Sequence, residues 1–408
     1  MASTKIPVNL ELRPAYYDDF HCLAAGCRLS CCKYWSITFS KKDYLSLKRQ
    51  SGSPELNQRL EHGLRRIRKG PVAGIYYGEF NMDNGSCPLL REDCLCALQM
   101  ESGHYALPEV CRAFPRAASY LPSGYLERSL SPACEGVLAL LWDLPGGIEF
   151  LADPLPKTNQ RLVWVDEEQP LLIGFQEIRS ICIDLLQDRR RPLRERILLI
   201  GVALRELMDK RDVSKWAAWA TALPESVDTR TLLQGVMEND TALHKFISSA
   251  LRVLLMIQSS DQDFAALRDE ILTATGVSFH AGTSDATVNH MAYLNARARY
   301  QEQFGDRDYF MENLMVALFF HLHLPDVHSS EALWKSFVNF CNLYSVYRFM
   351  MVMSCRKGAA GGRNELFRAA VHVSRALIHN STRQQELRDE FFQNDSATLA
   401  HMAILLGG

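Results

Sequence analysis

The segment CLAAGCRLSCC, residues 22–32, organises the first third of this 408-residue chain. It holds four of the nine cysteines that lie between residues 22 and 134, whereas the other three of the twelve are scattered singly through apolar stretches. Eight of the nine form a pattern, namely Cys22, Cys27, Cys31, Cys32, Cys87, Cys96, Cys111 and Cys134. Such clustering without a secretory signal predicts metal ligands rather than disulfides, because a reducing compartment keeps thiols free.

The expected metal follows from ligand chemistry and spacing. Thiolate suits zinc or an iron–sulfur cluster, and each centre needs about four donors, so eight thiols can serve one centre or two. Zinc ribbons usually pair their ligands as Cys-x2-Cys, which this chain lacks, whereas the vicinal Cys31-Cys32 and the proline after Cys87 favour an iron–sulfur site. We therefore predict an iron–sulfur cluster, with structural zinc and unliganded thiols as alternatives.

One member of the vicinal pair Cys31-Cys32, and also Cys94, are expected to differ from the other thiols. Adjacent side chains tend to diverge, so one of Cys31 and Cys32 is expected to have a second role. Cys94 lies only two residues before Cys96 and is expected to be an additional thiol outside the ligand set.

The composition is that of an ordinary globular protein, with 47% hydrophobic and 23% charged residues and a length typical of two or three domains. A net charge of -2 creates no overall field for nucleic acid or anionic lipid, so neither is expected as a partner. The N-terminal MASTKIPVNLELRP lacks the basic and apolar regions of a signal peptide, and the longest apolar runs are shorter than the roughly 18–20 residues of a membrane span. We expect a cytoplasmic protein without membrane segments.

We predict a mainly α fold in two parts, a cysteine-rich metal-binding module with short strands at residues 1–145 and an all-α domain at residues 171–408. Within the module, Ser53-Pro54 begins a helix and the sequence about residues 122–124 forms a hairpin. Residues 146–170 are rich in structure-breaking residues and form the predicted linker.

Long helical periods characterise the predicted all-α domain. Apolar residues recur every three or four positions over 193–207 and 366–377. Residues 314–322 and 337–353 are apolar nearly all round, which predicts central helices. Interruptions at 279–285 and 358–362 are predicted loops.

The cysteine pattern resembles a known family. Cys22-x4-Cys27-x3-Cys31-Cys32 with Trp35, followed by Cys87-Pro-Leu-Leu, Leu95-Cys96 and Cys111-Arg-Ala-Phe-Pro-Arg116, is similar to the CxxCxxCC metal-binding group of bacterial proteins. Within that group the chain resembles the flagellin lysine-N-methylases. Further similarities are PAYY at 14–17, LERSL at 126–130, DRRRPLRER at 188–196 and YFMEN at 309–313. The likeness runs from about residue 14 to about residue 350, does not require Cys94 and gives no match in the tail beyond residue 355.

This resemblance implies transfer of methyl groups from S-adenosylmethionine to the ε-amine of flagellin lysines before export, in a protein that carries a cysteine-bound cluster of 4Fe-4S type. The reaction requires a neutral lysine aimed at the sulfonium methyl group. An apolar, aromatic channel lowers the lysine pKa by desolvation, and a tyrosine or carboxylate can take the proton. We predict Tyr17, Tyr309 and Glu312 as catalytic residues, with Tyr16 and Trp35 as further candidates. Core packing is the alternative for the aromatic residues, and a helix N-terminal turn is the alternative for Glu312.

Residues that bind the methyl donor are not identified by any signature. A Rossmann methyltransferase has a Gly-x-Gly turn directly after a buried strand, whereas residues 358–362 follow a helical segment, and Asn289-His290 lacks the neighbours of a SET domain. His321 and His323 are interpreted as structural. The arginines of 188–196 are interpreted as a solvated face, with docking of flagellin as the alternative.

Two other functions remain open from the sequence. The chain can be a non-enzymatic metal or redox module whose helical domain is a protein-interaction platform. It can also be an electron-transfer or maturation protein. Binding of S-adenosylmethionine separates the methyltransferase from the first alternative. Exposed cysteines together with a reversible reduction of the protein would favour the second.

Overall fold

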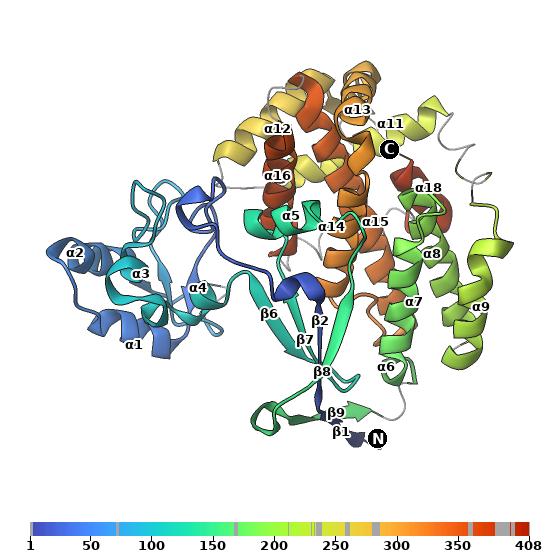
Figure 1. The fold of residues 1–408 in the computed structure, drawn as a ribbon. Helices are drawn as coiled ribbons and strands as arrows, with labels where there is room; N and C mark the ends of the chain where they lie inside the picture. Colours follow the sequence, from blue (N-terminus) through green and yellow to red (C-terminus); the bar gives the residue numbers. More distant parts are fainter. Residues whose placement is uncertain are drawn as a thin grey trace.

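The computed structural model describes residues 3–70, 73–166, 170–210, 212–229, 231, 233, 239–257, 262–279, 286–357, 362–379, 392 and 396–407. Figure 1 shows a small cysteine-rich unit, residues 22–113, at one side of the molecule. A sheet lies beside it, and helices make up the larger remaining part. None of the helices in these described ranges is long and apolar enough to cross a membrane.

Four strands form a mixed sheet in the order β6-β7-β2-β8. They are β2 (Leu10–Pro14), β6 (Arg116–Tyr120), β7 (Tyr125–Leu130) and β8 (Phe150–Pro154). Because β6 and β7 are antiparallel, with Tyr120 opposite Leu126, the predicted hairpin about residues 122–124 is confirmed. β2 is parallel to β7 and antiparallel to β8, so the first residues of the chain connect this hairpin to the later strand.

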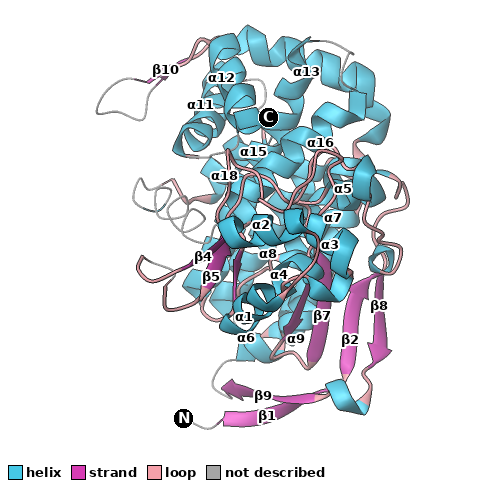
Figure 2. Cartoon of the chain, turned by 90° about the vertical axis from the view of Figure 1, so that its left-hand side faces the viewer, coloured by secondary structure: helices cyan, strands magenta, loops and turns pink. Residues whose placement is uncertain are grey.

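A two-stranded ribbon of β1 (Ser3–Val8) and β9 (Arg161–Asp166) projects from this sheet (Figures 1 and 2). The predicted linker, residues 146–170, therefore contains β8 and β9, and both strands pair with the N-terminal segment. These two strands were not predicted from the sequence. The prolines and glycines do mark turns, but the pairing depends on partner strands far away in the sequence.

The cysteine-rich unit has its own small core. Its elements are β3 (Thr38–Phe39), α1 (Lys41–Arg49), α2 (Pro54–Gly63), β4 (Leu64–Arg66), β5 (Gly78–Phe80), α3 (Ala97–Ser102) and α4 (Glu109–Ala113). The strands form a sheet in the order β3-β5-β4. Ser53 caps α2 by accepting a hydrogen bond from the Leu56 N–H at 3.1 Å, as predicted. Phe39, Leu56 and Leu98 are buried beneath these elements and hold the unit together.

The helical part begins with α5 (Glu135–Trp142), which packs into the large core and not into that of the cysteine-rich unit. The other helices are α6 (Pro170–Ile173), α7 (Phe175–Gln187), α8 (Leu193–Lys210), α9 (Val213–Ser226), α11 (Asp240–Met256), α12 (Gln262–Thr275), α13 (His290–Phe304), α14 (Tyr309–His321), α15 (Ser330–Ser354), α16 (Gly362–Val373) and α18 (Leu399–Leu406). A π-helical turn, Ser374–Ile378, continues α16.

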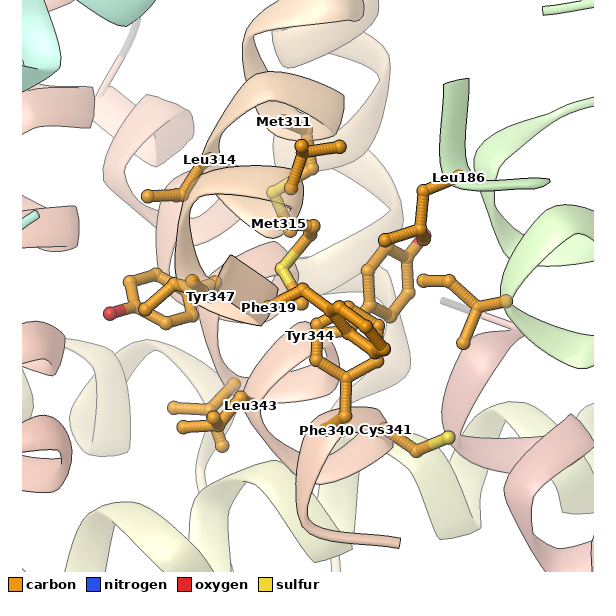
Figure 3. Packing of buried hydrophobic residues seen from close by; sticks show 14 of the residues in the cluster. Leu186, Met311, Leu314, Met315, Phe319, Phe340, Cys341, Leu343, Tyr344 and Tyr347 are labelled. Atoms are coloured by element: carbon orange, nitrogen blue, oxygen red, sulfur yellow. The ribbon is translucent and has the colours of Figure 1, made fainter. Parts of the chain in front are cut away.

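Helices α14 and α15 lie at the centre of the large core, as their apolar sequences predict. Figure 3 shows side chains of the two helices in contact, and the rings of Phe319 and Phe340 meet edge to face with centroids 5.1 Å apart. The helical C-terminal part is thus confirmed, although β10 (Ser278–Phe279) and β11 (Ala286–Thr287) add a short strand pair that the all-α prediction did not include. The predicted loops at residues 279–285 and 358–362 fall mostly outside the described residues, because residues 280–285 and 358–361 are not described.

Candidate functional site

A cavity of 790 Å³ lies between the cysteine-rich unit and the helical part. Thiols contribute to its wall, namely Cys31, Cys32, Cys87, Cys96 and Cys111. The helical part contributes His321, His372, Arg375 and His379. This size is within the range of small-molecule sites, so the cavity is the candidate functional site.

Local backbone geometry directs N–H groups toward several thiols. Cys96 and Cys134 immediately precede α3 and α5, and each sulfur accepts hydrogen bonds from the N–H groups two and three residues further on. The Cys87 sulfur accepts hydrogen bonds from the N–H groups of Leu89 and Leu90, and the Cys27 sulfur accepts one from the N–H group of Leu29. The Ala24 N–H lies 3.4 Å from the Cys22 sulfur. Such donors stabilise a thiolate, which is the form that binds a metal.

Burial of the thiols opposes the effect of these N–H donors on the thiol pKa. It raises the pKa of Cys27 and of Cys87 to about 12 and that of Cys134 to about 11, although the backbone N–H groups lower each value. These thiols are therefore neutral at pH 7 when no cation compensates their charge. A metal ion deprotonates such a thiol by taking the place of its proton.

The electrostatic neighbours of each thiol divide the cysteines into two groups. In addition to burial, the charges of Cys87, Cys31 and Cys96 raise the pKa of Cys111. Likewise in addition to burial, the charges of Cys134 and Cys31 raise the pKa of Cys27. Cys31 therefore stands between both groups. Within the described part of the chain, no three or more Cys, His, Asp or Glu side chains are arranged closely enough to hold a metal ion. The thiols are neighbours, but they do not converge on one point.

The vicinal pair differs in its ability to ionise. A hydrogen bond from Cys32 and, to a smaller extent, the positive charge of Arg375 together lower the pKa of Cys31 to about 7, against the opposing effect of burial. The same contact raises the pKa of Cys32, as does burial. Cys31 is thus the more readily ionised thiol of the pair. Cys94 is exposed and does not line the cavity.

Histidines of the helical part are held by serines at the end of β7. His321 Nδ1 lies 2.8 Å from Ser129 Oγ, and His379 Nε2 lies 2.9 Å from Ser131 Oγ. Burial lowers the pKa of His321 to about 3 and that of His379 to about 4, so both imidazoles are neutral at pH 7. They can donate or accept a hydrogen bond in the cavity without adding charge.

Strand β7 also carries a buried carboxylate. Glu127 is 1% exposed, and its oxygens accept hydrogen bonds from Arg179 and from Gln176, the latter at 2.7 Å. His323 Nδ1 lies 3.2 Å from the same carboxylate. Burial raises the pKa of Glu127, but the hydrogen bond to His323 and the charge of Arg179 outweigh this effect and lower it. The LERSL segment thus joins the sheet to the helices, and the structural interpretation of His323 agrees with these contacts.

The three predicted catalytic residues do not line the cavity. Tyr17 is buried in the large core. The Tyr309 hydroxyl donates a hydrogen bond to the Trp142 carbonyl at 3.0 Å. Glu312 is 1% exposed and accepts hydrogen bonds from Arg189. Tyr17 and Glu312 are thus buried and Tyr309 is half-buried, and the catalytic roles of all three stay predictions.

The arginine-rich segment is paired internally. Arg196 donates to Glu312 at 2.7 Å, and Arg189 donates to the same carboxylate at 2.8 Å. Arg190 is exposed but forms ion pairs with Asp188 and Glu225. The interpretation of this segment as a basic docking strip is therefore not favoured by its contacts.

Sequence reasoning missed Arg375 and His379 as site residues. Both follow residue 355, beyond which the sequence motifs predicted no likeness, and neither belongs to a recognisable motif. Arg375 lies in the π-helical turn, and no local sequence signal predicted such a turn. His321 was interpreted as structural, but it also lines the cavity.

Comparison with known proteins identifies one matching family model, the FliB lysine N-methylase C-terminal domain, over residues 179–405. This match covers more than half of the chain, and it continues to residue 405, so the expectation of no match beyond residue 355 is wrong. It includes α8, α14, α15 and α16, and therefore every residue that the helical part contributes to the cavity wall from His321 onward.

Similar proteins with curated names come from Salmonella. A "Lysine-N-methylase" of Salmonella choleraesuis is 32% identical over 142 residues, which is 32% of this chain and 32% of that protein. One of Salmonella typhimurium is 32% identical over 137 residues, with the same coverage. The "Flagellar biosynthetic protein FliU" of Salmonella muenchen is 31% identical over 137 residues, 32% of this chain and 76% of that protein. The similarity thus spans about a third of the first two relatives, and no solved structure matches the chain.

Proposed function

Because the chain belongs to the FliB lysine N-methylase family, we propose that it is a protein-lysine N-methyltransferase that transfers methyl groups from S-adenosylmethionine to the ε-amines of flagellin lysines. The observation that carries this proposal is the match over residues 179–405. The matched residues provide the histidines and Arg375 of the cavity wall. The protein would act in the cytoplasm, on flagellin that has not yet been exported.

The surroundings of the cavity suit the amine that must react. A lysine side chain that enters the cavity loses its hydration there, and the positive charge of Arg116 on the cavity wall opposes a further cation. Both effects favour the neutral amine. In the transfer step, the amine lone pair forms the new N–C bond while the C–S bond breaks. The electron pair of that bond remains on sulfur, so the positive charge passes from sulfur to nitrogen.

The cysteines support a bound cluster, which we propose to be of the 4Fe-4S type, with zinc as the alternative. The candidate ligands are Cys22, Cys27, Cys31, Cys32, Cys87, Cys96, Cys111 and Cys134. The fit rests on the thiols gathered at the cavity wall and on the backbone N–H groups directed at their sulfurs, a feature of iron–sulfur ligation. When bound, the cluster would supply a cross-link between loops and a redox-active centre.

The test of activity is incubation of anaerobically purified protein with flagellin and S-adenosylmethionine, followed by mass spectrometry of flagellin peptides. We expect lysine masses to increase in methyl-sized steps, and no increase when the donor is omitted. An unmodified flagellin in the presence of a metal-replete protein would contradict the proposal. Calorimetric titration with S-adenosylmethionine distinguishes a methyltransferase from a metal module that binds no donor.

The test of the metal is an absorption spectrum with iron, sulfide and zinc analysis of the same preparation. Stoichiometric iron and sulfide in a brown protein would support the cluster, whereas stoichiometric zinc in a colourless protein would replace it. A Cys111→Ala variant should lose metal, because Cys111 is a cavity thiol. Cys182→Ala is the control, since Cys182 is a cysteine of α7 within the large core and does not line the cavity.

A further inference from the structure

The π-helical turn Ser374–Ile378 shapes one side of the cavity. It continues α16, and it brings Arg375 and Ala376 to the cavity wall together with His379, which follows the turn. Single π-helical turns are rare and are frequent at functional sites, because the wider turn redirects side chains that a regular helix would place elsewhere.

Arg375 places a positive charge inside a mostly apolar site. The residue is 9% exposed, and its Nη2 atom donates a hydrogen bond to the Leu29 carbonyl at 2.6 Å. Its guanidinium carbon lies 5.4 Å from the centre of the Trp35 ring. A buried charge is costly unless other groups compensate it, and the planar guanidinium fits a carboxylate better than other side chains do.

The other charged residues at the cavity also have partners. The Glu79 carboxylate accepts a hydrogen bond from Arg65 at 2.7 Å. Arg116 lies 4.9 Å from the centre of the Phe20 ring and donates to the Phe20 carbonyl at 3.0 Å. Arg375 likewise donates to a carbonyl and lies over a ring, but its ring, Trp35, lines the cavity, whereas Phe20 does not. Arg375 is therefore the cation best placed for an anionic group of a ligand that packs on Trp35.

Three rings form what we call the aromatic shelf, defined as Trp35, Phe114 and His379. Trp35 meets Phe114 edge to face at 5.0 Å between centroids and meets His379 in the same way at 4.9 Å. All three residues line the cavity. Such rings provide an apolar surface on which a flat heteroaromatic group can pack.

We propose that this cavity is the methyl-donor site, in which Arg375 binds the carboxylate of the amino-acid portion and the aromatic shelf holds the adenine ring. The ligand class is a nucleoside joined through sulfur to an amino acid. This inference rests on the proposed function, since the donor is S-adenosylmethionine only if the protein is a methyltransferase. It assigns the donor residues that no sequence signature identified.

The test compares two ligands in calorimetric titrations. S-adenosylhomocysteine carries the carboxylate, whereas methylthioadenosine has the same nucleoside and sulfur without the amino acid. An Arg375→Met variant should bind S-adenosylhomocysteine at least about ten-fold more weakly, as expected for loss of a charged hydrogen-bonded pair. It should bind methylthioadenosine as the wild-type protein does, because only the carboxylate contact is removed.

Two further variants control for folding and for general effects of an arginine change. Arg375→Lys retains the charge without the planar group and should give a smaller loss than Arg375→Met. Arg205→Met removes an arginine that lies 4.7 Å over the Trp334 ring, away from the cavity-lining residues, and should leave the affinity for both ligands unchanged.

Each outcome decides the inference. Equal weakening of both ligands by Arg375→Met would assign the residue to cavity shape and overturn the proposed contact. No weakening of either ligand, or no binding to the wild-type protein, would also overturn it. If flagellin is methylated while binding is independent of Arg375, the inference fails and the function stands. If S-adenosylhomocysteine binding depends on Arg375 but no lysine is methylated, the donor site stands and the function fails.

Discussion

Replacing Glu312 by Gln should lower the free energy of unfolding by about 3 kcal/mol. The carboxylate of Glu312 is 1% exposed, and it accepts a hydrogen bond at 2.7 Å from Arg196, whose side chain is only 7% exposed. Glutamine keeps the shape but removes the charge, so the arginine remains buried without its counter-ion. Breaking a buried pair in this way typically costs about 3–5 kcal/mol. We take the lower end, because the second partner, Arg189, is 40% exposed and water screens its charge.

The assay is urea unfolding followed by far-ultraviolet circular dichroism. With a slope of about 3 kcal/mol per molar urea, the midpoint should fall by about 1 M. Glu331→Gln is the control, since it removes an exposed ion pair with Lys335 and should leave the midpoint unchanged. The variant also tests the predicted catalytic role of Glu312. A midpoint equal to wild type together with loss of methyl transfer would refute the structural account and support catalysis. Lower stability with normal activity per folded molecule would do the reverse.

Three further predictions concern metal content and pH. Cys27→Ala should reduce the bound metal and the thermal stability more than Cys94→Ala, because Cys94 is exposed and Cys27 lies among the other thiols; equal losses would undo this ranking. Wild-type stability should fall as pH drops from about 6.5 toward 4, since unfolded histidine takes up a proton that buried His379 resists, and melting curves of His379→Gln should fall less over this interval. The lowered pKa of Glu127 stabilises the fold above its usual value of 4.5, and this contribution is lost on acidification below it. A Glu127→Gln variant that loses as much stability as wild type in that acid range would contradict this assignment.

Local sequence signals predicted those elements whose neighbours along the chain determine them. The helix at Ser53-Pro54 has its cap and first turn within four residues, and the hairpin about residues 122–124 has both strands next to its turn. Helices α14 and α15 were predicted to be central because nearly every position is apolar. In each case the residues that determine the element lie within one short segment of the sequence.

Long-range pairing could not be predicted in the same way. Strand β2 lies between β7 and β8, and its partners are more than a hundred residues away. The pattern of the β8 segment alone does not distinguish a paired strand from a connection, because strand preference depends on what the neighbouring strand offers. This is why the strands within residues 146–170 were not predicted.

The site shows the same division. The cysteine pattern predicted one part of the cavity wall, since thiols that recur at close spacing in a reducing compartment are typical of metal sites. The histidines and Arg375 gave no such signal, because a single histidine or arginine is common in any helix. Only the folded structure brings these residues to the cavity, for example through the hydrogen bond between Ser131 after β7 and His379.

The contacts between the cysteine-rich unit and the helical part show how the two parts of the cavity wall depend on each other. Arg375 donates to the carbonyl of Leu29, which lies in the same loop as Cys27 and Cys31. A metal bound by these thiols would fix the loop, and the loop in turn would fix the carbonyl and the Trp35 ring beside the arginine. If the proposed cluster is bound, it would hold one side of the proposed donor site in place without touching the methyl group. In this view the cysteines are positioning residues, and the residues that contact the donor come from the aromatic shelf and from the turn after α16.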